Sequence, residues 1–292
     1  RIPSSAASDV YKRQLFNRAL SGQYPPASTL KPFVGMAALE AKTISWEKEI
    51  LDSGKYLVEG DERPYKGWKE GGHGMVDMNK AIIESSDVYF YSLAYDLTIK
   101  NLSPFLEKFG FGKQSGLSKN EGTGILPSRK WKLGYIGEPW FKGDTINMGI
   151  GQGYITATPL QIALAYSALA NKGKLVQPRI IEKIGEEDTK IVIKKNISLN
   201  DDKNWKRIEK SLLGVVEAKN GTANNIYDKN VRIAGKTGTA QVKSIIETEY
   251  ELLRVDKSLR DHALFVGYGP IEEPKLVVVA IIGILAAVGV VA

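Results

Sequence analysis

The chain has 292 residues, of which 43% are hydrophobic and 25% charged, as in soluble globular proteins with a substantial buried core. It contains no cysteine, which excludes thiol catalysis, thiolate metal sites and disulfides, and its two histidines, His73 and His262, are too few for a histidine metal cage. The net charge of +7 favours anionic partners, but acidic residues lie among the basic ones, and no arginine-rich run predicts a nucleic-acid site.

Residues 1–14 lack the charged and apolar regions of a signal peptide, so we interpret them as an extraneous or disordered leader. The first strong element begins at Ser28. Residues 30–39 have almost no polar face, which predicts a central, buried helix. Proline is tolerated only in a first turn, so Pro32 fixes where this helix starts and places Ser28 at its N-terminus.

Lys31 lies inside this apolar helix, three residues after Ser28 and on the same face. Because desolvation disfavours an ammonium group, we expect the pKa of Lys31 to be lowered enough for it to act as a base for Ser28. Free N–H groups at the helix N-terminus suit a developing oxyanion. Alone, the S-x-x-K pattern is weak: it recurs at residues 45–48, and a serine that caps a helix explains most single matches.

The remaining interior is predicted to alternate helices, loops and late strands. Helices are predicted at 78–84, 88–97, 158–171, where a capping box with proline opens the helix, and 205–218. A glycine-rich loop region is predicted at 110–153, a hairpin at 178–195, and a connecting loop within 243–261. Strands are predicted at 231–243, 262–269 and 276–282.

The last 17 residues, 276–292, are all apolar, which is short of the roughly 20 that a membrane helix needs. Their first half is rich in valine and isoleucine and is typical of a buried strand. We therefore expect one domain over residues 15–282, followed by an aberrant apolar tail at 283–292.

Two further motifs carry polar groups suited to catalysis. Residues 85–87, Ser-Ser-Asp, place a hydroxyl and a carboxylate on a break between helices, where a simple helix cap is the alternative interpretation. Residues 236–239, Lys-Thr-Gly-Thr, follow Gly235 in a strand-like segment whose glycines allow a ligand backbone to approach. The alternative is an edge strand that a lysine protects against aggregation.

The three motifs in this order, S-x-x-K, S-x-D and K-T-G, resemble the signature set of penicillin-binding proteins and class A β-lactamases. The likeness extends to residues 24–32, 72–74, 143–147, 151–153, 158–161, 235–241 and 262–268. Together these segments resemble the transpeptidase domain of class B penicillin-binding proteins, particularly the penicillin-binding protein 2 branch that serves rod elongation. The resemblance covers about residues 15–282.

The resemblance implies a role for each motif residue. Ser28 would be the acylated nucleophile, Lys31 its base, and Ser85 the relay that passes the proton to the departing D-alanine. Asp87, which stands where many relatives have asparagine, would orient this network, and Lys236 would supply positive potential. The substrate carboxylate would be bound by the segment of Thr237, Gly238 and Thr239, and the oxyanion by the backbone N–H groups of Ser28 and Thr239.

The implied fold is of the mixed α/β (α+β) class: the penicillin-binding transpeptidase or serine β-lactamase-like fold, an antiparallel sheet flanked by helices plus a mostly helical subdomain. Relatives contribute two sheet strands before the segment that begins here and end with a helix on the sheet. We therefore expect a fragment whose N-terminal strands and C-terminal helix are missing, with a three-stranded sheet whose third strand has an uncovered edge. As written, such a fragment should be poorly soluble and weakly active.

The implied activity is peptidoglycan D,D-transpeptidation in cell-wall elongation, with β-lactams as inhibitors and no cofactor. The implied location is the bacterial inner membrane with the catalytic domain in the periplasm. The implied partners are peptidoglycan stem peptides and, through the family's non-catalytic pedestal, the rod-elongation glycosyltransferase and scaffold proteins.

Some relatives bind zinc through aspartates, a histidine and a cysteine near the S-x-D motif. Here His73 and Asp52 remain, but Ser86 stands where the cysteine is expected, so we predict no metal site.

Two alternatives keep the pocket and change the outcome. A D,D-carboxypeptidase or β-lactamase would pass the acyl group to water, but the E-x-x-L-N segment of class A β-lactamases is absent. A non-catalytic penicillin-binding sensor would retain the same motifs. The basic charge leaves a nucleic-acid binder as a formal third option, which absence of salt-dependent DNA binding would exclude.

Overall fold

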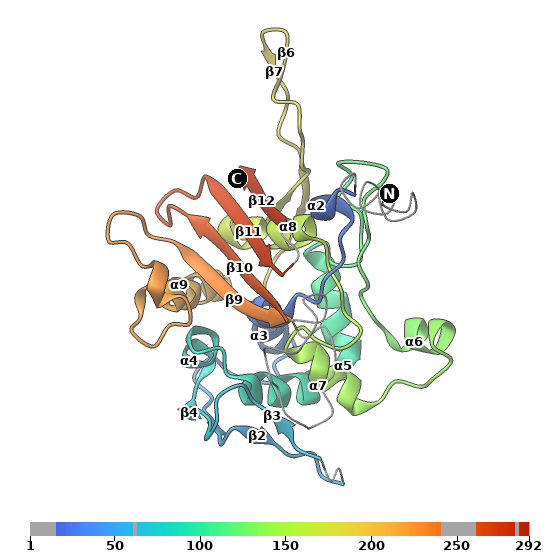
Figure 1. The fold of residues 1–292 in the computed structure, drawn as a ribbon, viewed down its shortest axis with the longest axis vertical. Coiled ribbons are helices and arrows are strands. Elements are labelled where there is room, and N and C mark those ends of the chain that lie inside the picture. Colours follow the sequence, from blue (N-terminus) through green and yellow to red (C-terminus); the bar gives the residue numbers. More distant parts are fainter. Residues whose placement is uncertain (1–15, 61–62, 241–260, 284–285, 292) are drawn as a thin grey trace, which may run out of the picture.

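The computed structural model describes residues 16–60, 63–240, 261–283 and 286–291. Figure 1 shows a sheet with helices packed on it and, beside it, a mostly helical region that also carries small two-stranded sheets. This agrees with the predicted α/β fold class. The predicted leader at 1–14 and nearly all of the predicted loop at 243–261 lie outside the described residues.

The described helices and strands follow the sequence in this order. The α-helices are α2 (Arg18–Ser21), α3 (Lys31–Glu40), α4 (Met78–Ile83), α5 (Asp87–Lys108), α6 (Arg129–Tyr135), α7 (Lys142–Gly149), α8 (Pro159–Ala170) and α9 (Lys203–Glu217). Two 3-10 helices are η1 (Ala27–Leu30) and η2 (Asn224–Ile226). The strands are β1 (Ile50–Asp52), β2 (Lys55–Tyr56), β3 (Tyr65–Lys66), β4 (Gly74–Val76), β5 (Lys174–Val176), β6 (Lys183–Ile184), β7 (Glu187–Asp188), β8 (Ile193–Asn196), β9 (Ala234–Ala240), β10 (His262–Gly269), β11 (Leu276–Ile282) and β12 (Ala286–Val291).

The main sheet has four antiparallel strands in the order β12-β11-β10-β9. The expectation of three strands with an uncovered third edge is therefore wrong. Strand β12, within the predicted apolar tail, pairs along β11 from Leu276↔Val291 to Ile281↔Ala286. This pairing satisfies backbone N–H and C=O groups that an uncovered edge would leave open.

The core forms where the apolar helices meet each other and the sheet. In α3, every residue from Lys31 to Ala38 is buried, as its uniformly apolar sequence predicts. Phe33 makes edge-to-face contacts with Phe109, Phe111 and Tyr166 of neighbouring segments. Helix α8 is buried along its whole length, packs against β10, β11 and β12, and begins at the predicted capping box.

Two predictions of element bounds are wrong. Helix α5 continues past residue 97 to Lys108, with a kink at Thr98, whose φ of 61° and ψ of 158° are not helical. The region predicted as loop at 110–153 contains α6 and α7. Glycines mark the turns around these two helices, but Ser128 caps α6 by accepting from the backbone N–H of Trp131, at 3.1 Å.

The hairpin predicted at 178–195 forms and projects from the molecule, with β6 and β7 at its tip (Figure 1). The helix predicted at 205–218 is α9, and the three late strands are β9, β10 and β11. Of the strand predicted at 231–243, residues 234–240 pair and residues 241–243 lie outside the described part. Among the described helices, none has the length and apolar character needed to cross a bilayer.

Candidate active site

Ser28 lies in the 3-10 turn η1, directly before α3, so its predicted place at a helix N-terminus is confirmed. The turn is held at both ends: the backbone N–H of Ala27 donates to the carbonyl of Gly151 at 2.9 Å, and the Tyr166 hydroxyl donates to the carbonyl of Thr29 at 2.8 Å. The Ser28 side chain is partly exposed, whereas its neighbours in η1 are buried. The turn therefore leaves Ser28 partly accessible to solvent while the residues around it are packed in the core.

Lys31 is fully buried and its ammonium group has three acceptors. Its Nζ donates to the Ser85 carbonyl at 2.8 Å, to Ser85 Oγ at 3.2 Å and to Asp87 Oδ1 at 2.7 Å. Burial lowers the pKa of Lys31, and the charge and hydrogen bond of Asp87 partly oppose this effect. The lowered pKa agrees with the expectation from its apolar helix, but within the described residues Lys31 bonds to the second motif and not to Ser28.

The Ser85–Asp87 turn brings its polar groups to Lys31 through an unusual backbone conformation. Ser85 has a φ of 58°, which turns its carbonyl toward Lys31 and toward Trp68, whose indole Nε1 donates to it at 3.0 Å. Asp87 starts helix α5, and its second oxygen, Oδ2, accepts from the Trp68 backbone N–H at 2.9 Å. A helix N-terminus stabilises a carboxylate, so the second motif provides Lys31 with a charged partner.

Lys236 on β9 is also fully buried, and its Nζ donates to the Thr237 carbonyl at 3.2 Å. Burial lowers its pKa well below the usual value; the positive charge of Lys31 lowers it further, while Asp87 raises it. The positive charge of Lys31 thus disfavours the ammonium form of Lys236. Both are influenced by the one carboxylate of Asp87.

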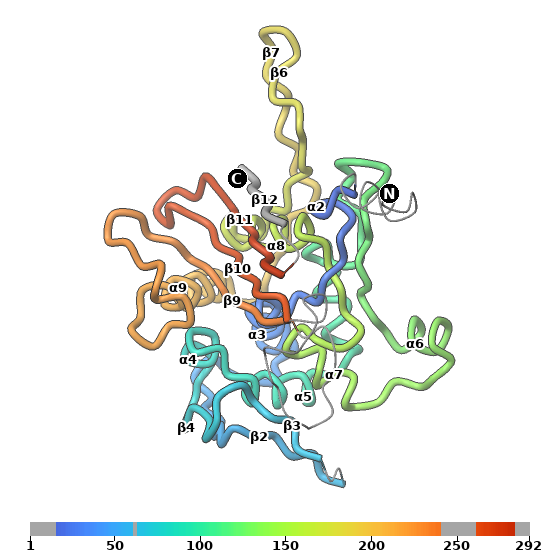
Figure 2. Tube along the Cα trace, viewed as in Figure 1, coloured from blue at the N-terminus to red at the C-terminus, as the bar shows by residue number. Residues whose placement is uncertain are grey.

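Strand β9 runs directly against the turn that carries Ser28 (Figure 2). Gly238 allows this approach: a Cβ there would lie 3.3 Å from Ala27 Cβ and 3.3 Å from Thr29 Cγ2, and only 3.4 Å from the Ser28 backbone nitrogen. On the same strand Thr239 is exposed and Thr237 is half-buried. The third motif therefore lies beside Ser28 with its hydroxyl-bearing residues more open to solvent than its lysine.

Three further residues at the site had been given no role from the sequence. Trp68 holds both Ser85 and Asp87, the Thr222 hydroxyl lies 2.7 Å from that of Thr237, and Gln152 Nε2 donates to the Thr239 carbonyl at 3.0 Å. Gln152 belongs to one of the segments that carry the family resemblance. Nothing in the sequence marks Trp68 or Thr222, because each reaches the site from a loop distant in the chain.

The residues near the second motif do not fit a metal site. Asp52 and His73 are present, but both carboxylate oxygens of Asp52 accept hydrogen bonds, from Gly54, His73 and Ser86. The serine hydroxyl is a poor substitute for a thiolate ligand of zinc. In the part of the chain that the structure describes, no three His, Asp or Glu residues are grouped so that they could hold a metal ion.

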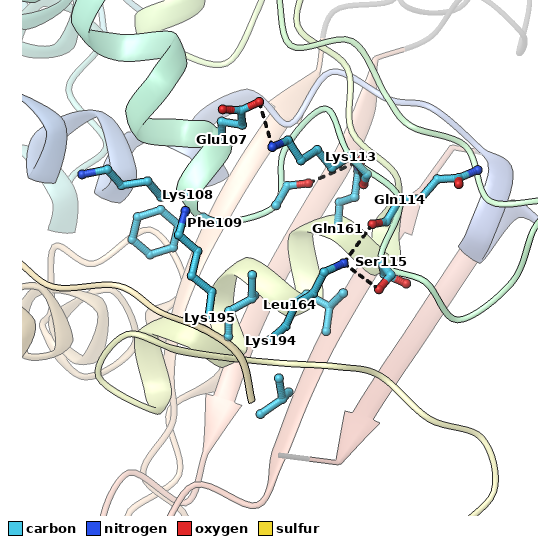
Figure 3. A pocket seen from close by; sticks show the side chains of 13 residues that line it. Glu107, Lys108, Phe109, Lys113, Gln114, Ser115, Gln161, Leu164, Lys194 and Lys195 are labelled. Atoms are coloured by element: carbon cyan, nitrogen blue, oxygen red, sulfur yellow. Dashed lines mark hydrogen bonds and ion pairs between the residues drawn. The ribbon is translucent and has the colours of Figure 1, made fainter. Parts of the chain in front are cut away.

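A cavity of about 180 Å³ lies away from the motifs, between the end of α5, helix α8 and strands β5 and β8 (Figure 3). Its floor is apolar and its rim carries lysines, of which Lys194 donates to the carbonyls of Gln114 and Ser115 and Lys113 pairs with Glu107. None of its lining residues belongs to the three motifs. The candidate site is therefore the place beside Ser28 where the three motifs meet, and not this cavity.

Comparison with known proteins points to one family. Residues 3–283 match the penicillin binding protein transpeptidase domain. The chain is 42% identical over 277 residues to the peptidoglycan D,D-transpeptidase MrdA of Haemophilus influenzae, covering 92% of this chain and 42% of that protein. It is 37% identical over 275 residues to MrdA of Escherichia coli, covering 92% of this chain and 43% of that protein. The chain thus spans less than half the length of these relatives.

Solved structures agree with this likeness. Pseudomonas aeruginosa PBP2 in complex with WCK 5153 superposes with a TM-score of 0.82 at 36% identity, covering 99% of this chain and 62% of that one. PBP2 in the complex with MreC from Helicobacter pylori superposes with a TM-score of 0.78 at 30% identity, covering 96% of this chain and 50% of that one.

Proposed function

This chain belongs to the penicillin-binding protein transpeptidase family, and from that premise we propose that it is a peptidoglycan D,D-transpeptidase that acts through an acyl-enzyme on Ser28. The observation that carries the proposal is the buried side-chain amine of Lys31, one turn after Ser28 and bonded to Ser85 and Asp87. A lysine with a lowered pKa beside a hydroxyl is the arrangement that activates a serine without a histidine.

In the proposed acylation, Ser28 Oγ attacks the carbonyl carbon of the D-alanyl-D-alanine bond, and its proton passes to neutral Lys31. A neutral Lys31 retains two N–H donors, enough for the Ser85 carbonyl and Asp87, and turns its lone pair toward the serine hydroxyls. Ser85 Oγ, at 3.2 Å from Nζ, then relays the proton to the departing amine of D-alanine. The C–N bond breaks as the ester to Ser28 forms.

Strand β9 is proposed to bind the substrate. The hydroxyls of Thr237 and Thr239 lie on the same strand as the buried Lys236 and are proposed to donate to the terminal carboxylate of the stem peptide. The backbone N–H groups of Ser28 and Thr239 are proposed to stabilise the oxyanion, and the close approach of Gly238 to η1 supports this assignment.

In the second half-reaction, an amine of a neighbouring stem peptide attacks the acyl-enzyme carbonyl. An amide cross-link forms, the ester bond to Ser28 breaks, and the amine proton returns to the serine through the lysine. A β-lactam would acylate the same serine, because its strained amide lies where the D-alanyl-D-alanine bond would lie. The whole protein is proposed to act in cell-wall elongation at the periplasmic face of the inner membrane, with the rod-elongation glycosyltransferase and scaffold proteins as partners.

Mass spectrometry after exposure to benzylpenicillin tests the proposal. We expect one adduct per chain, on the tryptic peptide that contains Ser28, and no adduct in Ser28→Ala. Lys31→Ala should abolish acylation while Lys48→Ala, the lysine of the second S-x-x-K match, should retain it. An adduct elsewhere, or acylation of Lys31→Ala at the unmodified rate, would contradict the assignment.

A further inference from the structure

The Asp52 carboxylate is a buried acceptor whose two oxygens are both occupied. Oδ1 accepts from the Gly54 backbone N–H at 2.8 Å, and Oδ2 accepts from Ser86 Oγ at 2.6 Å and from His73 Nδ1 at 2.6 Å. Burial alone would raise the pKa of Asp52, but the hydrogen bonds from Ser86, Gly54 and His73 outweigh burial and lower it. A charged carboxylate is therefore held at the end of β1.

Glycine makes this arrangement possible in the backbone. Gly72 has a φ of 75°, and a Cβ at that position would lie 2.2 Å from the Asp52 carbonyl oxygen. That oxygen accepts from the His73 backbone N–H at 3.1 Å. The loop that carries His73 is thus packed directly onto the turn that carries Asp52, and any side chain at position 72 would separate them.

Ser86 connects the Asp52 carboxylate to the second motif, residues 85–87. Its hydroxyl donates to Asp52 and accepts from the Tyr89 backbone N–H at 3.2 Å, where it caps helix α5. Both the donor and an acceptor of the hydroxyl are thereby fixed. The residues on either side of Ser86 are Ser85 and Asp87, the two that bind Lys31.

The opposite side of the turn is held by Trp68, whose ring lies edge-on to His73 with 5.5 Å between centroids. Trp68 donates to Ser85 from its indole and to Asp87 from its backbone. The positive φ of Ser85 is therefore stabilised from two sides, by Ser86, which bonds to Asp52, and by Trp68, whose ring contacts His73.

We propose that Asp52 is a positioning residue: with His73 and Ser86 it forms a metal-free hydrogen-bonded tie that holds Ser85 and Asp87 around Lys31. The proposal rests on the proposed function, because its effect is exerted through the acylation of Ser28. Its basis is that the residues present differ from the zinc ligands of some relatives. Ser86 has a hydroxyl where those relatives have a thiolate, and this hydroxyl donates directly to the Asp52 carboxylate.

The test compares acylation by a fluorescent penicillin in the unmodified 292-residue chain and in four variants. Ser86→Ala removes the tie, and we expect its acylation rate constant to fall about tenfold or more, the effect of losing a hydrogen bond to a charged group. Ser86→Thr keeps a hydroxyl that caps a helix and should restore most of the rate. Ser128→Ala removes the same kind of cap from α6 and should leave the rate unchanged.

Asp52→Asn supplies a readout that a purely structural role would not change. The charged groups that act on Lys31 are Asp87 from α5 and Asp52 from β1, which favour its ammonium form, and Lys236 from β9 is a like charge close to it. Removing the Asp52 charge should move the acidic limb of the acylation–pH profile to lower pH. Ser86→Ala should lower the rate without that displacement, because it leaves the Asp52 charge in place.

Two kinetic outcomes would overturn the proposal. One is acylation of both Ser86→Ala and Asp52→Asn at the unmodified rate with an unchanged pH profile. The other is failure of Ser86→Thr to recover the rate although this variant unfolds at the unmodified temperature. Stoichiometric zinc in the purified chain, measured by atomic emission, would also overturn it. If the unmodified chain does not acylate, the proposed function fails, and NMR titration of Lys31 then decides the positioning role. Asp52→Asn should lower the pKa of Lys31, and no change would refute the proposal.

Discussion

Asp87→Asn changes the charge beside Lys31 without changing volume. In the structure one carboxylate oxygen accepts from Lys31 Nζ at 2.7 Å and the other from the Trp68 backbone N–H at 2.9 Å. An asparagine has one acceptor oxygen and one NH2 group. In either orientation its NH2 group therefore faces one of the two donors, the Lys31 ammonium or the Trp68 backbone N–H, and cannot accept from it. The substitution therefore breaks one hydrogen bond and leaves the ammonium without a counter-charge.

The expected loss follows from burial. Lys31 is fully buried and the Asp87 side chain is 12% exposed, so solvent does little to replace the lost partner. Removing one member of a buried ion pair costs about 3–5 kcal/mol when the other stays charged. We expect Asp87→Asn to lower the free energy of unfolding by about this amount at pH 7.

The loss should depend on pH in one direction. Burial lowers the pKa of Lys31 below the value of 10.5 that it has when unfolded, and in the variant the opposing effect of Asp87 is gone. The pKa of Lys31 in the folded variant is therefore lower than in the folded unmodified protein. As a result, the pH range in which the folded protein binds fewer protons than the unfolded chain extends to lower pH in the variant. Its stability should rise with pH by up to about 1.4 kcal/mol per unit in that extra window, so the difference between the two proteins shrinks as pH rises.

Urea unfolding followed by circular dichroism between pH 6 and 9 measures this difference. The control is the double variant Lys31→Met/Asp87→Asn, in which no ammonium is left unpaired, so the additional pH dependence should disappear. A destabilisation of less than about 1 kcal/mol at pH 7, or one that is the same across the range, would refute the account of a buried lysine held by Asp87.

Three further predictions concern the support of the site. Gly238→Ala should slow penicillin acylation about tenfold, since its Cβ, 3.3 Å from Ala27 Cβ, pushes β9 away from Ser28 by a few tenths of an ångström. Thr158→Ala should lower the free energy of unfolding by about 1 kcal/mol, because it removes the cap of α8, and should leave acylation unchanged. His262→Phe should reduce the loss of stability in acid. Burial lowers the pKa of His262 from 6.5, although the nearby Asp261 partly opposes this effect. The neutral imidazole therefore stabilises the fold above pH 6.5, and this contribution is lost as pH falls through the pKa of the folded state.

Each has a clear contrary result. Unmodified acylation kinetics of the alanine variant at position 238 would mean that β9 does not set the geometry at Ser28. A change in acylation rate with Thr158→Ala would mean that α8 controls the site and does not only support it. A stability profile below pH 6.5 that is the same with and without His262 would mean that other groups cause the acid sensitivity.

Local sequence signals determined much of the fold. The uniformly apolar run after Pro32 fixed α3, and with it the burial of Lys31 one turn from Ser28. The capping box fixed the start of α8, and period and composition placed β10 and β11. The frequent glycines between residues 110 and 153 were misleading, because they mark turns but do not show that short helices lie between those turns. Extension of the sheet to β12 was also missed, since pairing at a sheet edge depends on which strands meet in space.

The order of the three motifs in the chain predicted which residues would meet, but only the tertiary structure decided how. Lys31 takes as its partner Asp87, 56 residues away, and not the serine beside it. The tie from Asp52 through Ser86, and the support from Trp68, join four separate segments. The physical reason is that helix propensity and hydrophobic period act over a few residues, whereas a buried polar group is bonded to whichever partners the packed core brings within about 3 Å.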